Sequence, residues 1–414
     1  MIIPSIDLMN GKAVQLKQGR ELILEREDVA GLARAFDRFG EIAVIDLDAA
    51  LGRGSNAEAI RTICRLAECR VGGGLRTVEA ARSAIASGAA KVIVGTAAIG
   101  PEGVHKDFLE GLAAAIGRMR IIIALDTRDG DVVIRGWTER TGLRVEDVLA
   151  SLEPYCGEFL CTFVEKEGTM EGLPVERAIA LAGKTRNRIT AAGGIGSLQD
   201  IERLAQAGLS VQLGMSIYTG RVEIAEAFIR SLDWSKGLLP TIVQDEYGQV
   251  LMLAYSDPES LARTFEDGRM HFHSRSRGRL WLKGETSGNF LDLVRVRADC
   301  DADTILASVR PRGPACHLDT YSCFGPRRFS ISELEAVVAD RLANPRPGSY
   351  TATLDDAALA EKIREEAEEL IEAQTPADVV WEAADVLYFS IVKMVRSGAT
   401  WTDVLRELER RRRI

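Results

Sequence analysis

Short runs of apolar residues recur along the first 232 residues, and helical patterns separate most of them. Most of these runs are continuously apolar, which is typical of strands in a parallel sheet covered by helices. The runs span residues 2–8, 42–48, 69–74, 91–96, 121–127, 159–164, 188–194 and 211–216. Eight strand–helix units in roughly 230 residues fit a (β/α)8 barrel, so we predict this α/β fold for residues 1–232.

The predicted barrel contains an internal repeat. Gly73 and Gly193 lie 120 residues apart, and each begins a segment that leads through a helix to a second glycine-rich strand end. Nearly the same offset separates Asp7 from Asp126, which end the first and fifth runs. Active sites of such barrels lie at the carboxyl ends of the strands. We therefore expect Asp7 and Asp126 to face each other as a general base and a general acid.

The glycine-rich strand ends are candidate phosphate sites, because glycines leave backbone N–H groups accessible to an anion. Two such sites are predicted on opposite sides of the barrel mouth, so a substrate phosphorylated at both ends would span them. Their residues are Gly73, Gly74, Gly95 and Thr96 in one half and Gly193, Gly194, Gly214 and Ser216 in the other. The alternative is that these glycines only form tight turns.

Residues 233–240 break the helical pattern and form a predicted linker to a smaller, β-rich α+β module over residues 239–328. This module holds Cys300, Cys316 and Cys323, three of the seven cysteines of the chain. Three cysteines suit zinc and leave a fourth position for water. The alternative is that they are buried free thiols.

Alternation of apolar and polar residues around Cys300 predicts a strand. In a strand, Asp299, Asp301 and Asp303 would share one face and Cys300 would point the other way. Three neighbouring carboxylates repel each other, and a divalent cation bound through oxygen ligands would relieve that repulsion. The alternative is a solvated acidic edge.

Residues 329–414 have a helical pattern, interrupted at Pro345 and Pro347. Acidic residues three positions apart share one face of a helix. The pairs beside apolar positions are Glu366 with Glu369, flanked by Glu365, and Glu382 with Asp385. Two helices that present these carboxylates to one another could bind magnesium on a pyrophosphate, whereas the alternative is a solvated helix edge.

Composition narrows the class of protein. The 414 residues are 46% hydrophobic and carry a formal net charge of −9, which argues against nucleic-acid binding. We expect no transmembrane helix, because no run of 18 apolar residues occurs, and no signal peptide. Seven scattered cysteines favour a reducing cytoplasm over a disulfide framework.

The barrel segment resembles the histidine-biosynthesis isomerase that rearranges the formimino-linked ribonucleotide ProFAR by an Amadori shift. The segments IPSIDL, DLDAALGRGSN, VGGGLRT, LDTRDG and RGW carry this resemblance. It implies that Asp7 is the base, Asp126 the acid, and that Thr162 assists them. Trp137 would stack on the heterocycle of the substrate, although a tryptophan that only anchors its loop is an equal alternative.

Four positions depart from that family. Gln15 stands where arginine is usual, and Phe163 replaces an acidic residue. Glu167 replaces the aspartate of a D-G-T turn, and Met215 replaces a basic residue near a phosphate. The loss of positive charge should weaken the binding of a phosphorylated substrate.

The second module resembles phosphoribosyl-AMP cyclohydrolase over about ninety residues, through IVQD, VLMLAY, SRSRGRLWLKGETSGN, DCDAD and GPACH. The resemblance implies zinc bound by the three cysteines, which come from two subunits in the family, and hence a homodimer. It also implies magnesium on Asp299, Asp301 and Asp303. His317 would shuttle a proton or contact substrate, and Arg275, Arg277 and Lys283 could bind phosphate. The roles of His271 and His273 stay open.

The helical module resembles phosphoribosyl-ATP pyrophosphohydrolase, through its paired acidic motifs and the segment DRLANPRPGSYT. The resemblance implies magnesium at the acidic residues. Together the three resemblances predict consecutive steps of histidine biosynthesis, with phosphoribosyl-ATP, phosphoribosyl-AMP and ProFAR as substrates. The main alternative is a two-activity enzyme whose altered barrel serves as a scaffold. A protein that only binds, with a structural zinc, fits less well, because structural zinc sites usually have four protein ligands.

Overall fold

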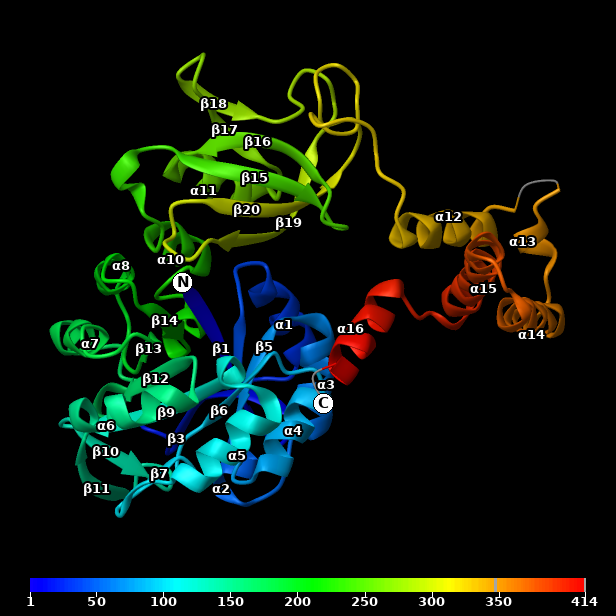
Figure 1. Ribbon diagram of the computed structural model, residues 1–414. Coiled ribbons are helices and arrows are strands. Elements are labelled where there is room, and N and C mark those ends of the chain that lie inside the picture. Colours follow the sequence, from blue (N-terminus) through cyan, green and yellow to red (C-terminus); the bar gives the residue numbers. More distant parts are fainter. Residues whose placement is uncertain (346–347, 413–414) are drawn as a thin grey trace. The chain divides into compact units, whose positions relative to one another are not determined.

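The computed structural model describes residues 1–345 and 348–412, and Figure 1 shows its helices and strands. Contacts along the chain divide it into two compact units, residues 1–326 and residues 327–412. Each unit has hydrophobic cores of its own.

Eight parallel strands in the first unit close into a barrel, as predicted. Their hydrogen-bonded order is β9-β12-β13-β14-β1-β4-β5-β6, and β6 pairs with β9 to complete the ring. The strands are β1 (Ile2–Met9), β4 (Ile42–Asp46), β5 (Cys69–Gly72), β6 (Lys91–Val94), β9 (Ile121–Arg128), β12 (Glu158–Phe163), β13 (Arg188–Ala192) and β14 (Ser210–Leu213). Most of their residues are buried, which accounts for the continuous apolar runs.

Helices lie around this ring (Figure 1) and pack on it through one large apolar core, while a small second core fills its interior. The helices are α1 (Val29–Asp37), α2 (Leu47–Leu51), α3 (Ala57–Leu66), α4 (Val78–Ala86), α5 (Lys106–Ile116), α6 (Val145–Leu152), α7 (Val175–Ala182), α8 (Leu198–Gln206), α9 (Met215–Tyr218) and α10 (Ile224–Arg230), with short 3-10 helices η1 (Arg118–Arg120), η2 (Glu153–Tyr155), η3 (Val164–Lys166) and η4 (Trp234–Lys236). Short antiparallel strands extend from the ring: β2 (Lys12–Lys17), β3 (Glu21–Arg26), β10 (Asp131–Ile134) and β11 (Glu139–Arg144). Strands β7 (Ile99–Gly100) and β8 (Gly103–Val104) form a separate two-stranded sheet.

The internal repeat has the same local geometry in both halves. Gly73 and Gly193 have φ of +96° and +99°, a region that favours glycine. A Cβ on Gly73 would lie 2.1 Å from the Asp46 carbonyl oxygen, and one on Gly193 would lie 2.6 Å from the Phe163 carbonyl oxygen. Both glycines are therefore required where each strand end passes close to the neighbouring strand.

A buried ionic cluster lies at the amino-terminal end of the barrel, because its members stand at or near the starts of strands. The Arg70 guanidinium bonds the carboxylates of Glu41 and Glu158, and Lys91 Nζ lies 2.9 Å from Glu41 Oε2. The Thr190 hydroxyl donates to Glu158. The side chain of Arg70 is only 2% exposed, so its charge depends on these partners.

The second module of this unit has a four-stranded sheet in the order β16-β15-β20-β19 and a separate hairpin, β17–β18. Its elements are β15 (Leu239–Asp245), β16 (Val250–Ser256), α11 (Pro258–Asp267), β17 (His271–Ser274), β18 (Arg279–Leu282), β19 (Leu291–Ala298) and β20 (Ile305–Pro311).

The prediction of a strand through Asp299–Asp303 is wrong. Strand β19 ends at Ala298, and a turn follows in which Ala302 has φ of +61°. The carboxylate of Asp299 causes this, because its Oδ1 accepts from the backbone N–H groups of Asp303 and Thr304. Alternation of apolar and polar residues cannot distinguish such a turn from the end of a strand.

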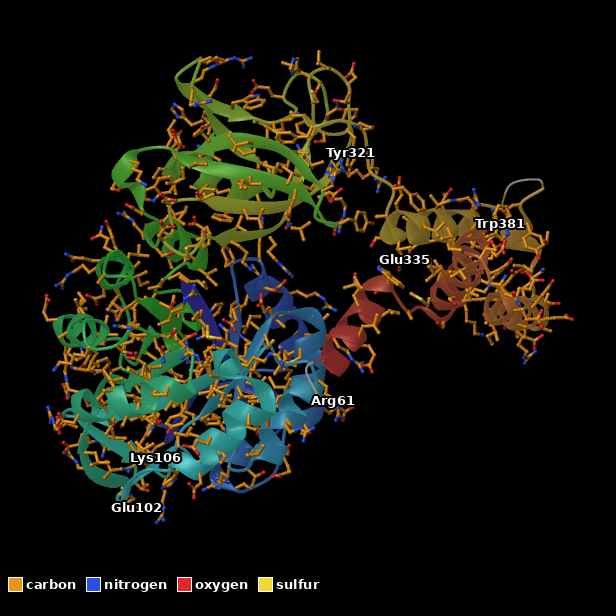
Figure 2. All side chains as sticks on the ribbon, viewed as in Figure 1. Arg61, Glu102, Lys106, Tyr321, Glu335 and Trp381 are labelled. Carbon is orange, nitrogen blue, oxygen red and sulfur yellow. The ribbon has the colours of Figure 1, made fainter. Side chains whose placement is uncertain are left out.

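The unit formed by residues 327–412 is all-helical, as predicted. It consists of α12 (Ile331–Ala343), α13 (Tyr350–Thr353), α14 (Asp356–Glu372), α15 (Pro376–Ser397) and α16 (Trp401–Arg412). Helix α12 ends before Pro345, whereas Pro347 lies outside the described residues. A small core that includes Val338, Leu359 and Phe389 holds α12, α14 and α15 together. The Trp401 backbone N–H donates to Glu335 of α12 (labelled in Figure 2).

The ionic cluster yields a stability prediction. Arg70→Met leaves Glu41 and Glu158 buried, with Lys91 as their remaining ion-pair partner among the described residues. We expect the free energy of unfolding to fall by about 3–5 kcal/mol, because removing one partner of a buried ion pair strands the other. Urea unfolding of the full chain measures this. Arg61→Met is the matched control, since Arg61 is exposed on α3 (Figure 2) and should change stability by under about 0.5 kcal/mol. Equal effects of the two substitutions would contradict a role for the cluster.

Candidate functional site

A cavity of about 680 Å³ opens at the barrel mouth. Its lining includes every predicted barrel site residue from both halves: Asp7, Gly73, Gly74, Gly95, Thr96, Asp126, Trp137, Thr162, Gly193, Gly194, Gly214 and Ser216. Closure of the ring explains this, because it brings the carboxyl ends of all eight barrel strands to one rim.

Asp7 and Asp126 extend into this cavity from opposite halves of the repeat. Ser5 Oγ donates to Asp7 Oδ1 at 2.7 Å, and burial raises the pKa of Asp7 to about 6 against this hydrogen bond. Burial also raises the pKa of Asp126, opposed by hydrogen bonds from Trp137 and Thr162. A carboxyl group with a pKa near neutrality is suited to exchange protons with a substrate.

A third carboxyl group, Glu167, lines the same cavity. Burial raises its pKa to about 8, and the negative charges of Asp7 and Asp126 add to the shift. The sequence marked Glu167 only as a departure from a family pattern. Its approach to the two aspartates depends on the loop after β12, where Gly168 packs so closely on Leu16 that a Cβ would lie 2.7 Å from the Leu16 carbonyl oxygen.

Trp137 is held against Asp126 at the wall of the cavity. Its indole Nε1 donates to Asp126 Oδ2 at 2.8 Å. The ring lies on Gly19, whose Cβ, if it had one, would be 2.8 Å from Trp137 Cζ3. Trp137 has a φ of +68°, an unusual backbone conformation for tryptophan. The side chain therefore both anchors its loop and presents an aromatic face at the site.

The two glycine-rich sites differ in charge. The first, at Gly73–Gly74 and Gly95–Thr96, shares the cavity lining with Arg76, and the Arg135 backbone N–H donates to Thr96 Oγ1. No arginine or lysine lines the cavity at the second, at Gly193–Gly194 and Gly214–Ser216, which we call the neutral site: Arg76 and Arg135 are the only arginines or lysines in the lining, as far as the described residues show.

The neutral site instead contains buried polar atoms that lack a partner among the described residues. They are Ser216 Oγ, Gln15 Nε2 and Gln212 Oε1. Gln15 is 3% exposed, and its Oε1 lies 2.8 Å from the position that a Cβ on Gly214 would occupy. Unpartnered buried polar atoms are unfavourable unless a ligand satisfies them; Gln15 Nε2 and Ser216 Oγ can donate to such a ligand, whereas Gln212 Oε1 can only accept. Of the other departures, Met215 lines the cavity, whereas Phe163 is buried in the outer apolar core.

In the second module, Cys316 and Cys323 lie together beside Lys283. The two thiols interact directly, and burial lowers the pKa of Lys283 against their opposing charge. A hydrogen bond from the Thr320 hydroxyl, the largest cause, lowers the pKa of Cys316, and the Leu318 backbone N–H also contributes. Cys316 and Cys323 with a nearby amine could supply part of a metal or anion site.

Cys300 does not join that pair. It is exposed on the turn after β19, and its Sγ contacts Asp301 at 3.9 Å. No group of three potential metal ligands that includes a cysteine occurs among residues 1–345 and 348–412. The carboxylates of Asp299, Asp301 and Asp303 do gather, within 4.8 Å of one another, although Lys236 Nζ lies 2.6 Å from Asp303 Oδ2.

The remaining candidates in this module already have protein partners. His317 is exposed with Nδ1 3.9 Å from Cys316 Sγ. His273 Nδ1 lies 2.7 Å from Asp257 Oδ2, and His271 Nδ1 lies 3.1 Å from the Arg269 carbonyl oxygen. Two candidate phosphate-binding arginines also have partners. The Arg275 guanidinium stacks 3.8 Å from the Tyr255 ring centroid, and Arg277 pairs with Glu285.

The helical unit brings Glu366, Glu382 and Asp385 together, with one oxygen of each within 4.8 Å of the others. Glu366 is 7% exposed, and Glu382 Oε2 is buried without a partner among the described residues. Burial raises the pKa of Glu382, and the charges of Glu369, Glu366 and Asp385 contribute. Glu365 is exposed and pairs with Lys362 at 2.8 Å. Three repelling carboxylates with a buried unpartnered oxygen suit a divalent cation.

A barrel with paired carboxylates at its mouth, a module with paired thiols and a helical module with clustered carboxylates together define a multidomain enzyme. None of the helices in the described part of the chain is long and apolar enough to cross a membrane.

Comparisons with known proteins specify this class. The family model described as "Histidine biosynthesis protein" matches residues 1–223. Models for phosphoribosyl-AMP cyclohydrolase and phosphoribosyl-ATP pyrophosphohydrolase match residues 252–325 and 331–412. The chain therefore belongs to the histidine biosynthesis family, and it carries an isomerase-type barrel followed by cyclohydrolase and pyrophosphohydrolase domains.

Curated relatives cover part of the chain. The histidine biosynthesis bifunctional protein HisIE of Pyrococcus furiosus is 39% identical over 206 residues, which are 45% of this chain and 99% of that protein. The Escherichia coli K12 protein of the same name is 42% identical over 194 residues, 44% of this chain and 96% of its own. The histidine biosynthesis trifunctional protein of Saccharomyces cerevisiae is 42% identical over 175 residues, but only 22% of its length is covered.

Proposed function

We propose that residues 1–232, 239–328 and 329–414 form three catalytic modules that act in reverse chain order. The helical module releases pyrophosphate from phosphoribosyl-ATP, the second module opens the purine ring of phosphoribosyl-AMP, and the barrel isomerises ProFAR. The observation that best supports the barrel's part is that two carboxyl groups and two glycine-rich sites share one cavity.

In the barrel, we assign Asp7 as the base and Asp126 as the acid of the Amadori shift. Asp126 would protonate the ring oxygen, so that the bond from C1′ to this oxygen breaks while the nitrogen on C1′ forms a C=N bond. Asp7 would then remove the proton from C2′, and the resulting enaminol would tautomerise to the aminoketone. Thr162, which hydrogen bonds Asp126, would position it. Glu167, neutral below its pKa of about 8, would avoid a third negative charge near the phosphorylated substrate.

The neutral second glycine-rich site favours a second candidate function for the barrel, that of a scaffold. Gln15 and Ser216 can donate hydrogen bonds to a phosphate but supply no positive charge, so binding there should be weaker than at the site with Arg76. Assay of the barrel reaction separates the two functions.

In the second module, we propose that Cys316 and Cys323 of one copy and Cys300 of a second copy bind zinc. When bound, zinc would supply an activated water for ring opening. The separation of Cys300 from the other two thiols supports this sharing. Exposed Leu318 and Phe324, both 71% exposed, flank the thiol pair and would be covered in a homodimer. Lys283, and Arg275 and Arg277 if they leave their partners, would bind phosphate, and His317 would carry a proton.

Magnesium is proposed at two acidic clusters. Asp299, Asp301 and Asp303 would bind it in the second module, after Lys236 leaves Asp303. Glu366, Glu382 and Asp385 would bind it in the helical module, with Glu365 and Glu369 at the edge. There it would neutralise the pyrophosphate of the substrate.

The pKa values of Asp7 and Glu167 predict how the isomerase reaction depends on pH. Because Asp7 must be ionised to act as a base, isomerase kcat/KM should fall as the pH drops below about 6. As the pH rises, kcat/KM should fall for two reasons, because the acid Asp126 loses its proton and because Glu167 becomes charged above about 8. Glu167→Gln should therefore reduce the alkaline decline without removing it, and Asp7→Asn should lower turnover by about 10²–10⁴-fold. An unchanged alkaline decline in Glu167→Gln would refute the role given to that residue. Absence of wild-type isomerase activity would leave the scaffold function.

Complementation between two variant subunits tests whether two copies of the chain share the proposed zinc site. Cys300→Ser and Cys316→Ser should each lose zinc and ring opening but keep pyrophosphate release. Coexpression of the two variants should restore about a quarter of wild-type ring opening, because half of the dimers are mixed and each has one intact site. Zinc content and activity of the mixture measure this. Cys156→Ala, in the barrel, is the control that keeps its zinc. If mixing restores nothing, the zinc site is not shared between copies.

Pyrophosphate release by the helical module should be independent of ring opening by the second module. Glu366→Gln and Asp385→Asn should abolish pyrophosphate release while ring opening of supplied phosphoribosyl-AMP stays normal, since the carboxylate clusters are separate. Glu361 is exposed on α14, the helix of Glu366, and Glu361→Gln should behave as wild type. Loss of both activities in folded variants would show that the modules are not independent.

A further inference from the structure

The barrel and the second module share a hydrophobic core. Phe39, between α1 and β4, and Phe228, on α10, belong to the barrel segment, whereas Phe265 lies on α11 of the second module. Their ring centroids are 5.1–6.2 Å apart. Leu232 and Leu261 join the same core from the two sides. The boundary between the modules in sequence is therefore not a boundary in packing.

One end of this junction is fixed by Asp37, the last residue of α1. Its carboxylate binds Arg295 and, at 3.3 Å, Arg297 of β19. Between those arginines, the Val296 backbone N–H donates to the Arg38 carbonyl oxygen at 2.8 Å. Asp37 is only 8% exposed, so the contact is largely shielded from solvent. Three consecutive residues of β19 are thereby attached to a barrel corner about 260 positions earlier in the chain.

The turn that follows β19 is held a second time, from the linker. The Asp233 backbone N–H donates to the Ala302 carbonyl oxygen at 2.8 Å. Lys236, on η4, bonds the carboxylate of Asp303. This turn carries Cys300 and the three clustered aspartates. Both ends of the segment from Arg295 to Asp303 are thus attached to the barrel or to its last helical connection.

We propose that the barrel and the linker after it are positioning elements of the cyclohydrolase module: in the metal-free chain, Asp37 and Lys236 together set the position of the turn that presents Cys300 and the aspartates. They act through that turn and touch no substrate. The consequence for metal binding rests on the proposed zinc function, whereas the mechanical attachment does not.

Hydrogen–deuterium exchange of the full, metal-chelated chain tests the attachment. Asp37→Asn should speed exchange about tenfold or more at Val296 and at the Asp303 and Thr304 amides of the turn, because local opening becomes easier. Lys236→Met, at an exposed position where unfolding is not expected, should speed exchange at the turn amides only. Arg312→Met, which removes a surface pair with Asp292 at the far end of β19, is the matched control and should change neither.

Zinc titration of the same variants supplies the functional readout. Asp37→Asn should weaken zinc binding relative to Arg312→Met, and Asp37→Glu should restore part of it. Unchanged exchange at the turn in both Asp37→Asn and Lys236→Met overturns the proposal. If exchange changes as expected but wild type binds no zinc, the attachment stands and the proposed zinc function fails.

Discussion

Closure of the ring by β6 and β9 is the constraint on which the barrel site depends. It forces the carboxyl ends of eight strands onto one rim, so that residues far apart in sequence line a single cavity. It also places the ionic cluster around Arg70 at the opposite end, away from the chemistry. The glycines of the rim follow from the same closure: at Gly73 and Gly193 a side chain would collide with the backbone of the neighbouring strand.

Burial explains which features the sequence could predict. The eight barrel strands are buried along nearly their whole length, so their apolar runs were informative. The internal repeat, whose offset is nearly the same for Asp7 and Asp126 as for the glycines, correctly predicted that the two aspartates line one cavity. The acidic pairs of α14 and α15 were also identifiable, because helical spacing fixes which side chains share a face. The roles of these residues stay predictions.

Features that depend on loop paths were not accessible in the same way. Alternation around Cys300 indicated a strand, but a carboxylate bonding its own backbone makes a turn there. Glu167 reaches the two aspartates only through the path of the loop after β12. The junction at Asp37 joins residues about 260 positions apart, and no local pattern marks it. The candidate zinc ligands could not be placed from the sequence either. One copy of the chain brings Cys316 and Cys323 together but not Cys300.

Supplying only the first substrate shows whether one chain performs the three consecutive reactions. The full chain, with zinc and magnesium, is given phosphoribosyl-ATP, and products are separated by chromatography, because ProFAR and its isomer have the same mass. If the three modules act in sequence, phosphoribosyl-AMP and then ProFAR should appear transiently while the isomer accumulates. Accumulation of ProFAR without its isomer, under conditions where an added isomerase converts it, would contradict the claim.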